Sequence, residues 1–143
     1  MKFPMKFNSM TSTAPGMNGT WETTSGDFSS TVAIPPEFSG PGGGLSPEDL
    51  FNHALTNCFV ATFKVYAANS KLSFKKVTAN SNLVVDLGDS KKPVMKSLKL
   101  KAQIHGASDG DKAQFLAKKA AQSGFILNSV KTDCQIEIEI LES

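Results

Sequence analysis

The chain has 143 residues, of which 40% are hydrophobic and 20% are charged, the composition of an ordinary globular protein. Its net charge of +2 is too small to indicate a nucleic-acid partner, and its length predicts one domain over residues 1–143. No segment is apolar for long enough to span a bilayer, and the first residues contain no signal-peptide pattern. We therefore expect a cytoplasmic protein that binds no membrane.

Residues 1–34 predict short strands. The segment TWETTSGDFSSTVAI is rich in Thr, Ser and Val on either side of a Ser-Gly-Asp turn, a pattern typical of a β-hairpin. The next segment, PPEFSGPGGG at residues 35–44, is a loop, because its prolines and glycines exclude a regular element. Its glycines either let the backbone approach another group closely or form a plain linker, and the sequence leaves both open.

The clearest prediction is a long central helix over residues 46–69. Ser46 is a suitable N-cap and Pro47 fits the first helical position, and two acidic residues follow where the helix dipole favours negative charge. Spacings of three and four residues predict a core-facing stripe, made of Leu50, Phe51, Ala54, Leu55, Cys58, Ala61, Thr62 and Val65. The other faces are also largely apolar. A helix of about 35 Å is too long for this chain to cover on every side, so we expect a second subunit to cover part of it.

The rest of the chain predicts a hairpin, a second helix and a last strand. The hairpin spans residues 72–105, and its second strand, SLKLKAQIH, alternates apolar and polar residues. The second helix spans residues 108–123, and the FILNSV segment after it is either a turn or a short strand. Residues 132–141 alternate again, with Cys134 on the same side as three isoleucines. This segregated order of elements indicates an α+β fold with antiparallel sheets.

The candidate nucleophiles are the two cysteines. Neither lies in a CxxC or His-rich cluster, so we expect no metal site, no other cofactor and, in a reducing compartment, no disulfide. Cys58, on an apolar helix stripe, is either a small hydrophobic residue or a reactive thiol activated by neighbouring side chains. Cys134 is expected to be an inert core residue. Glu48 has a structural explanation in the helix dipole alone.

The stretch PGGGLSPEDLFNHALTNCF resembles the OsmC/Ohr family, the osmotically inducible and organic hydroperoxide resistance proteins. The resemblance consists of the Gly-rich loop, the Ser-Pro-Glu helix start and the cysteine ten residues after the glutamate, followed by the same order of elements. It implies an intertwined homodimer in which antiparallel sheets wrap around two long central helices. It also implies a thiol peroxidase that reduces organic hydroperoxides and is reset by a thiol or lipoyl reductant.

Carried over residue by residue, the resemblance makes Cys58 the peroxidatic nucleophile and Glu48 the acid that helps to poise it. Ten residues along one helix span about 15 Å, so Glu48 and Cys58 of one chain cannot touch. We therefore expect each site to be shared across the dimer, with the acid supplied by the partner subunit. The same dimer cleft, lined by Phe51, Leu55, Phe59 and the loop at residues 35–44, is the expected binding site for the substrate.

Two positions depart from the family pattern. The resolving cysteine of the family falls where this chain has Ser123 followed by Gly124, and Cys134 lies too far along the chain to match it. The family's arginine has no counterpart, because all 15 basic residues are lysines, and a lysine such as Lys2 or Lys6 would supply only a point charge. We expect a one-cysteine or weakened peroxidase. The alternatives are a non-catalytic protein that binds a small apolar ligand in the same cleft and a purely structural relic of the family.

Overall fold

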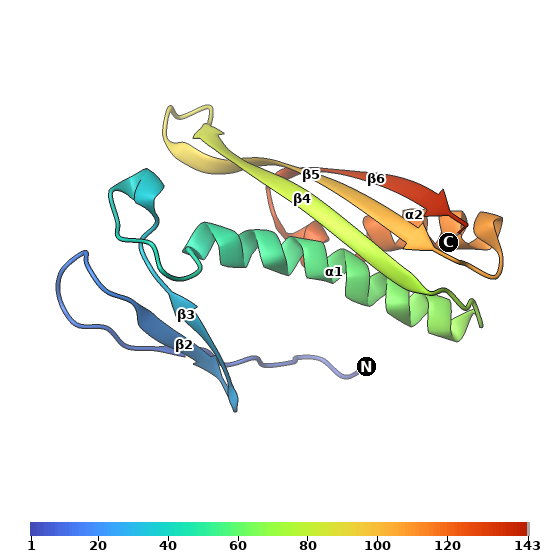
Figure 1. The fold of residues 1–143 in the computed structure, drawn as a ribbon, viewed down its shortest axis with the longest axis horizontal. Helices are drawn as coiled ribbons and strands as arrows, with labels where there is room; N and C mark the ends of the chain where they lie inside the picture. The colour runs from blue at the N-terminus through green and yellow to red at the C-terminus, as the bar shows by residue number, and fades with distance from the viewer. Residues whose placement is uncertain (143) are drawn as a thin grey trace. The chain divides into compact units, whose positions relative to one another are not determined.

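The computed structural model describes residues 1–142, and its elements form the α+β fold that the sequence predicts (Figure 1). In chain order they are β1 (Met10–Thr11), β2 (Trp21–Ser25), β3 (Phe28–Val32), η1 (Pro36–Phe38), α1 (Pro47–Asn69), β4 (Lys76–Leu87), β5 (Pro93–His105), α2 (Gly110–Ser123), η2 (Leu127–Ser129) and β6 (Asp133–Leu141). They fall into two compact units, Met1–Leu50 and Phe51–Ser143. Within residues 1–142, none of the helices combines the length and the hydropathy that a bilayer-spanning segment needs.

The N-terminal unit contains an antiparallel sheet in the order β1-β2-β3. Strands β2 and β3 form the predicted hairpin, and Gly26 in its turn has a φ of 60°, which glycine adopts without strain. The glycine-rich loop folds back onto the chain that precedes it. A Cβ added at Gly40 would overlap the Ile34 carbonyl, and one at Gly44 would lie 2.9 Å from the Thr31 carbonyl oxygen. These glycines therefore let the loop pack against its own backbone.

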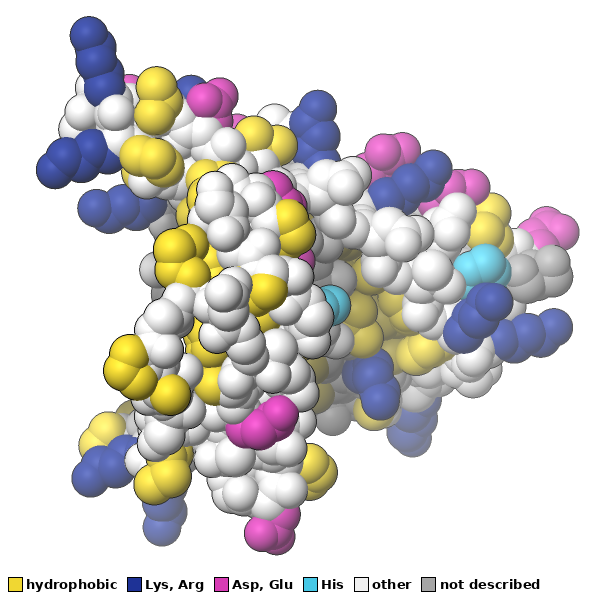
Figure 2. All heavy atoms as spheres, turned by 60° about the vertical axis from the view of Figure 1, so that its left-hand side comes forward, with side chains coloured by type: hydrophobic (Ala, Val, Ile, Leu, Met, Phe, Trp, Pro, Cys, Tyr) yellow, Lys and Arg dark blue, Asp and Glu magenta, His cyan; other side chains and the backbone are white. Residues whose placement is uncertain are grey.

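The N-terminal unit buries few hydrophobic side chains. Of its residues, Val32 and Ala33 belong to the buried hydrophobic set of the described chain. Large apolar side chains of the same unit are exposed, namely Met1, Phe3, Met5, Phe7, Met10, Met17, Phe28 and Phe38. Hydrophobic side chains are accordingly visible on the molecular surface in Figure 2. Exposed apolar side chains in such number are typical of a surface that another chain covers.

Helix α1 begins with a reciprocal pair of capping hydrogen bonds. The Asp49 amide donates to the Ser46 hydroxyl at 3.0 Å, and the Ser46 amide donates to the Asp49 carboxylate at 2.9 Å. This capping box satisfies two backbone donors at the end of the helix. The predicted N-cap at Ser46 is therefore confirmed, and the helix runs from Pro47 to Asn69.

The buried stripe of α1 differs from the predicted one. Leu55, Phe59, Phe63 and Ala67, spaced four residues apart, are at most 1% exposed. Val65, which the pattern places on the core side, is 55% exposed, and Ala61 of the same predicted stripe is also exposed, so that part of the prediction is wrong. The helix is turned to direct two phenylalanines inward, because an aromatic ring removes more apolar area from water than a valine or alanine does.

The second unit contains a sheet in the order β4-β5-β6. Strands β4 and β5 form the predicted antiparallel hairpin, with an irregularity in register between Val84 and Val85. Strand β6 pairs with β5 in parallel, because α2 carries the chain back along the sheet between them. The FILNSV segment, left open between turn and strand, contains the short 3-10 helix η2.

The core of the second unit lies between this sheet and the two helices, which Figure 1 shows along the sheet. The alternation predicted for β5 is confirmed: its buried residues are Leu98, Leu100, Ala102 and Ile104. From α2, Ala113, Leu116, Ala117 and Ala120 complete this core. The small residues on α2 allow the helix to approach the sheet closely, and the core fixes both helices that carry the candidate site.

Candidate functional site

The Cys58 side chain lies at the edge of the buried stripe of α1. It is half-buried and packs against the hydrophobic core. Its sulfur also lies against Gly124, the C-cap residue of α2: a Cβ added at Gly124 would be 2.6 Å from the Cys58 Sγ and 3.2 Å from the Leu127 Cδ1. The sulfur therefore occupies the space that a side chain at position 124 would need.

The polar surroundings of the Cys58 sulfur are sparse. Within residues 1–142 the thiol makes no hydrogen bond, although the backbone carbonyl of Cys58 accepts one from the Thr62 hydroxyl at 2.7 Å. The C-terminal end of α2 lies against the sulfur, and a helix C-terminus favours cations rather than the thiolate anion. A cation or hydrogen-bond donor that stabilises the Cys58 thiolate must therefore come from a group other than the end of α2.

Glu48 lies in the first turn of α1, as predicted, and is half-buried. Its Oε1 atom is buried and has no hydrogen-bond partner within the described residues. A buried carboxylate oxygen without a donor is costly, because the charge loses its hydration and gains nothing in return. The helix dipole accounts for the acid's position but leaves this oxygen unpaired.

Ser123, which stands at the predicted resolving position, is engaged in a polar cluster. Its hydroxyl donates to the Lys119 carbonyl at 2.6 Å and lies 2.6 Å from the Tyr66 hydroxyl on α1. The Lys119 Nζ lies 4.8 Å from the centre of the Tyr66 ring, a cation–π contact. Sequence patterns do not predict this cluster, because they place residues on a helix face without saying which residue of another helix they meet.

Cys134 faces the core from β6, as its position in the alternating strand predicts. Its thiol donates to the Thr132 carbonyl at 3.5 Å. Burial, and to a smaller extent the charge of Asp133, raise the pKa of this thiol above its ordinary value. Both effects disfavour the thiolate, which is the nucleophilic form.

The three predicted substrate-contacting residues do not have equal exposure. Leu55 and Phe59 have no exposed surface within the chain, and Phe59 stacks with Phe63 at a ring-centre separation of 6.4 Å. Phe51 is half-buried and packs at the margin of the same core. Of the three, only Phe51 presents surface that a ligand could contact without opening the core.

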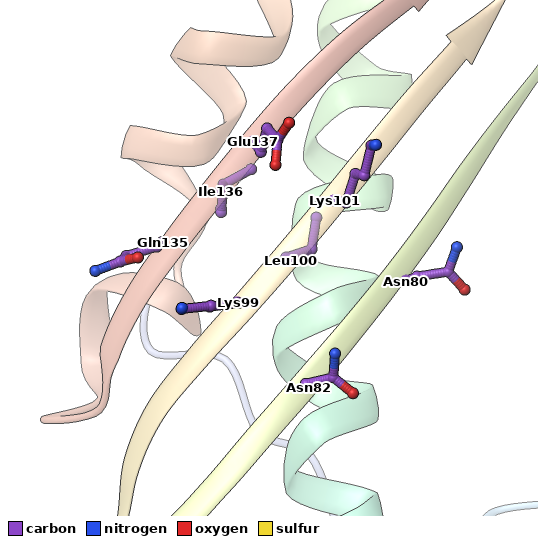
Figure 3. Close-up of a pocket in the computed structure, with 8 residues that line it drawn as sticks. All are labelled: Asn80, Asn82, Lys99, Leu100, Lys101, Gln135, Ile136 and Glu137. Carbon is purple, nitrogen blue, oxygen red and sulfur yellow. The ribbon is translucent and has the colours of Figure 1, made fainter.

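A hollow of about 680 Å³ lies on the β4-β5-β6 sheet (Figure 3). It is lined by Asn80, Asn82, Lys99, Leu100, Lys101, Gln135, Ile136 and Glu137. Lys99 and Lys101 alternate along β5 with its buried residues, so they stand on the face turned away from the core. The hollow is therefore separate from Cys58. Among residues 1–142, no group of three or more His, Cys, Asp or Glu side chains is placed to hold a metal ion.

The fold and the candidate site define the class of protein. The fold has two three-stranded sheets, a long helix that carries a half-buried thiol, and a second helix that ends against that thiol. Residues 40–139 match the family model described as OsmC-like protein, so the chain belongs to the OsmC-like family and the predicted resemblance is confirmed. It is 25% identical over 119 residues to the uncharacterized protein YmaD of Bacillus subtilis, an alignment that covers 80% of this chain and 79% of YmaD.

Solved structures share the fold. An OsmC-like protein of unknown function from Vibrio cholerae superposes with a TM-score of 0.85 at 17% identity, over 94% of this chain and 99% of that one. An organic hydroperoxide resistance protein OsmC from Legionella pneumophila gives a TM-score of 0.69 at 23% identity, over 98% of this chain and 99% of that one. The predicted fold class is thereby confirmed.

Proposed function

We propose that the protein is a thiol-dependent peroxidase that reduces organic hydroperoxides with Cys58 as its nucleophile. The observation that carries the proposal is a partly accessible cysteine on the central helix of an OsmC-like fold, ten residues after a half-buried glutamate. The similar structure from Legionella pneumophila is an organic hydroperoxide resistance protein, which supports hydroperoxides as the substrate class. A cytoplasmic location is part of the proposal.

The proposed first step is attack of the Cys58 thiolate on the terminal oxygen of the hydroperoxide. The O–O bond breaks as the S–O bond forms, sulfur is oxidised by two electrons to a sulfenic acid, and the alkoxide leaves as an alcohol after taking a proton. The hydrophobic core residues against which Cys58 packs suit an organic rather than a hydrated peroxide.

The second step uses an external reductant. Position 123 carries a serine whose hydroxyl is engaged in hydrogen bonds, and Cys134 is a poor nucleophile because burial raises the pKa of its thiol. A thiol or lipoyl reductant therefore attacks the Cys58 sulfenic acid, water leaves, and a mixed disulfide forms. A second thiol then attacks the reductant's sulfur in this mixed disulfide, which forms the oxidised reductant as a disulfide and releases the Cys58 thiolate, completing a one-cysteine cycle.

Glu48 takes part through a homodimer in this proposal. Helix geometry separates Glu48 and Cys58 by about 15 Å along α1, so the acid that serves one thiol is the partner subunit's Glu48. The unpaired Glu48 Oε1 would then gain a partner, and a lysine such as Lys2 or Lys6 would supply the positive charge that arginine gives elsewhere. The exposed apolar residues of the N-terminal unit support a second copy as partner.

A ligand-binding protein without catalysis is the other function that the sequence suggests. It would need a cleft lined by Phe51, Leu55 and Phe59, and two of these three side chains are fully buried within the chain. The burial of these two side chains counts against a function that depends on this cleft alone, whereas the peroxidase rests first on the half-buried Cys58 thiol.

Hydroperoxide consumption by the purified protein tests the proposal. Wild type, Cys58→Ser and Cys134→Ser are compared with cumene hydroperoxide and with dithiothreitol, a monothiol or dihydrolipoamide as reductant. We expect turnover by wild type and Cys134→Ser and none by Cys58→Ser, because Cys58 alone provides the nucleophile. Equal consumption by wild type and Cys58→Ser would refute the proposal, and loss of turnover in Cys134→Ser would refute the one-cysteine cycle.

A further inference from the structure

We propose that Tyr66 is a positioning residue that holds the end of α2 against the Cys58 sulfur through its hydrogen bond to Ser123 and thereby controls access to that thiol. The inference deepens the proposed function and rests on it, because it concerns the regulation of the same sulfur. It is carried by two contacts at consecutive positions of the chain. Ser123 binds Tyr66, and Gly124 covers Cys58.

The direction of the Tyr66–Ser123 hydrogen bond follows from the serine's other partner. A hydroxyl has one proton, and that of Ser123 is donated to the Lys119 carbonyl at 2.6 Å. The Tyr66 hydroxyl is therefore the donor in the 2.6 Å contact with Ser123. The Lys119 amine above the Tyr66 ring further fixes the ring. Together these contacts tie α1 to the last turn of α2.

The end of α2 contacts the Cys58 sulfur at the residue that follows Ser123. Gly124 follows Ser123 directly, and its Cα faces the Cys58 sulfur so closely that an added Cβ would lie 2.6 Å from it. Leu127 lies on the same side, with its Cδ1 3.2 Å from that Cβ position. One side of the sulfur is thus closed by the end of α2 for as long as the Tyr66–Ser123 hydrogen bond holds.

Reagents reach the covered side of Cys58 when the end of α2 opens locally. In that regime the modification rate is the opening equilibrium multiplied by the rate for the open thiol. Removal of the Tyr66 hydroxyl favours the open form. It exposes Cys58 to alkylation and its sulfenic acid to further oxidation, without removing any atom from the thiol itself.

Maleimide labelling of the purified protein tests this control. Rates of N-ethylmaleimide addition are measured separately at Cys58 and Cys134 by peptide mass spectrometry for wild type, Tyr66→Phe, Ser123→Ala and Ser123→Thr. We expect Tyr66→Phe and Ser123→Ala to label Cys58 about fivefold faster, the factor that corresponds to a net hydrogen bond of about 1 kcal/mol. Ser123→Thr keeps a hydroxyl and should label at the wild-type rate.

Two further comparisons test whether faster labelling of Cys58 comes from loss of the Tyr66–Ser123 hydrogen bond. The double variant Tyr66→Phe/Ser123→Ala should label Cys58 no faster than either single variant, because both remove the same bond. Thr132→Val removes a side-chain hydrogen bond to the Met95 carbonyl elsewhere in the unit and should leave Cys58 labelling unchanged. An unchanged Cys58 rate in Tyr66→Phe, or equal acceleration at Cys58 and Cys134, overturns the inference. Labelling needs no peroxidase activity, so a wild type that fails to reduce hydroperoxide overturns the proposed function alone.

Discussion

Gly124→Ala is the substitution whose consequence follows most directly from the geometry around Cys58. The new Cβ would lie 2.6 Å from the Cys58 Sγ and 3.2 Å from the Leu127 Cδ1, and the first distance is too short for any Cβ contact. Gly124 has a φ of −63° and a ψ of 132°, which alanine adopts freely, so the backbone adds no strain. The cost is therefore one of packing.

The change in the free energy of unfolding caused by Gly124→Ala is the difference between two opposing effects. Overpacking of a filled site costs about 1–3 kcal/mol, whereas replacing glycine restricts the unfolded chain and returns about 0.4–1 kcal/mol. We expect Gly124→Ala to lower the free energy of unfolding by about 1–2 kcal/mol, measured by urea denaturation under reducing conditions. Gly110→Ala is the matched control, because its Cβ would meet only the Ile140 Cγ2 at an ordinary 3.6 Å. It should be neutral or slightly stabilising.

A double-mutant cycle identifies the sulfur as the cause. In a Cys58→Ala background the Sγ is absent, so Gly124→Ala should lose most of its cost, and the coupling between the two sites should be about 1 kcal/mol. If Gly124→Ala costs the same in both backgrounds, the sulfur does not fill the space beside Gly124. The end of α2 would then not cover the Cys58 thiol.

Three further predictions concern the helix cap, the core and the second cysteine. Ser46→Ala should lower the free energy of unfolding by about 1 kcal/mol, because the Asp49 amide loses its acceptor; no change in a urea titration would contradict the capping box. Phe59→Ala should cost about 3–5 kcal/mol, since the ring is fully buried, and a cost below 1 kcal/mol would show a ring that is not core. In a Cys58→Ser background, Asp133→Asn should move the pH profile of Cys134 alkylation to lower pH. The pKa of Cys134 should still stay above its ordinary value because burial, the larger cause, remains; an unmoved profile would exclude the Asp133 charge as a cause.

The sequence predicts the elements of this fold well where local chemistry decides them. Ser46 and the acidic first turn fix the start of α1, and the alternation in SLKLKAQIH fixes the inward face of β5. The parallel pairing of β5 with β6 is not readable from either strand, because an alternating pattern fits both directions. The orientation of α1 is also mispredicted at Val65, since many of its faces are apolar and only tertiary packing selects among them.

For the candidate site, too, the sequence predicts some residues and misses others. Cys58 and Glu48 are found from their spacing on one helix, and the structure places both on α1. Gly124 and Tyr66 are not found, because their importance comes from contacts between α1 and the end of α2. The one sequence signal near them is the departure from the family pattern at Ser123 and Gly124. That departure marks where this chain differs without saying what the two residues contact.

The contact between Gly124 and Cys58 also bears on how the sulfenic acid is resolved. A disulfide needs the Cβ atoms of its two cysteines about 3.5–4.5 Å apart, and the position beside the Cys58 sulfur that could supply a second Cβ is occupied by a glycine. Its neighbour Ser123 has its hydroxyl committed to Lys119 and Tyr66. The end of α2 therefore acts on the thiol through its backbone and offers it no second sulfur. An oxidised Cys58 at this site depends on an external reductant, and the hydrogen bond between Tyr66 and Ser123 that holds the end of α2 controls the access of that reductant to the sulfur.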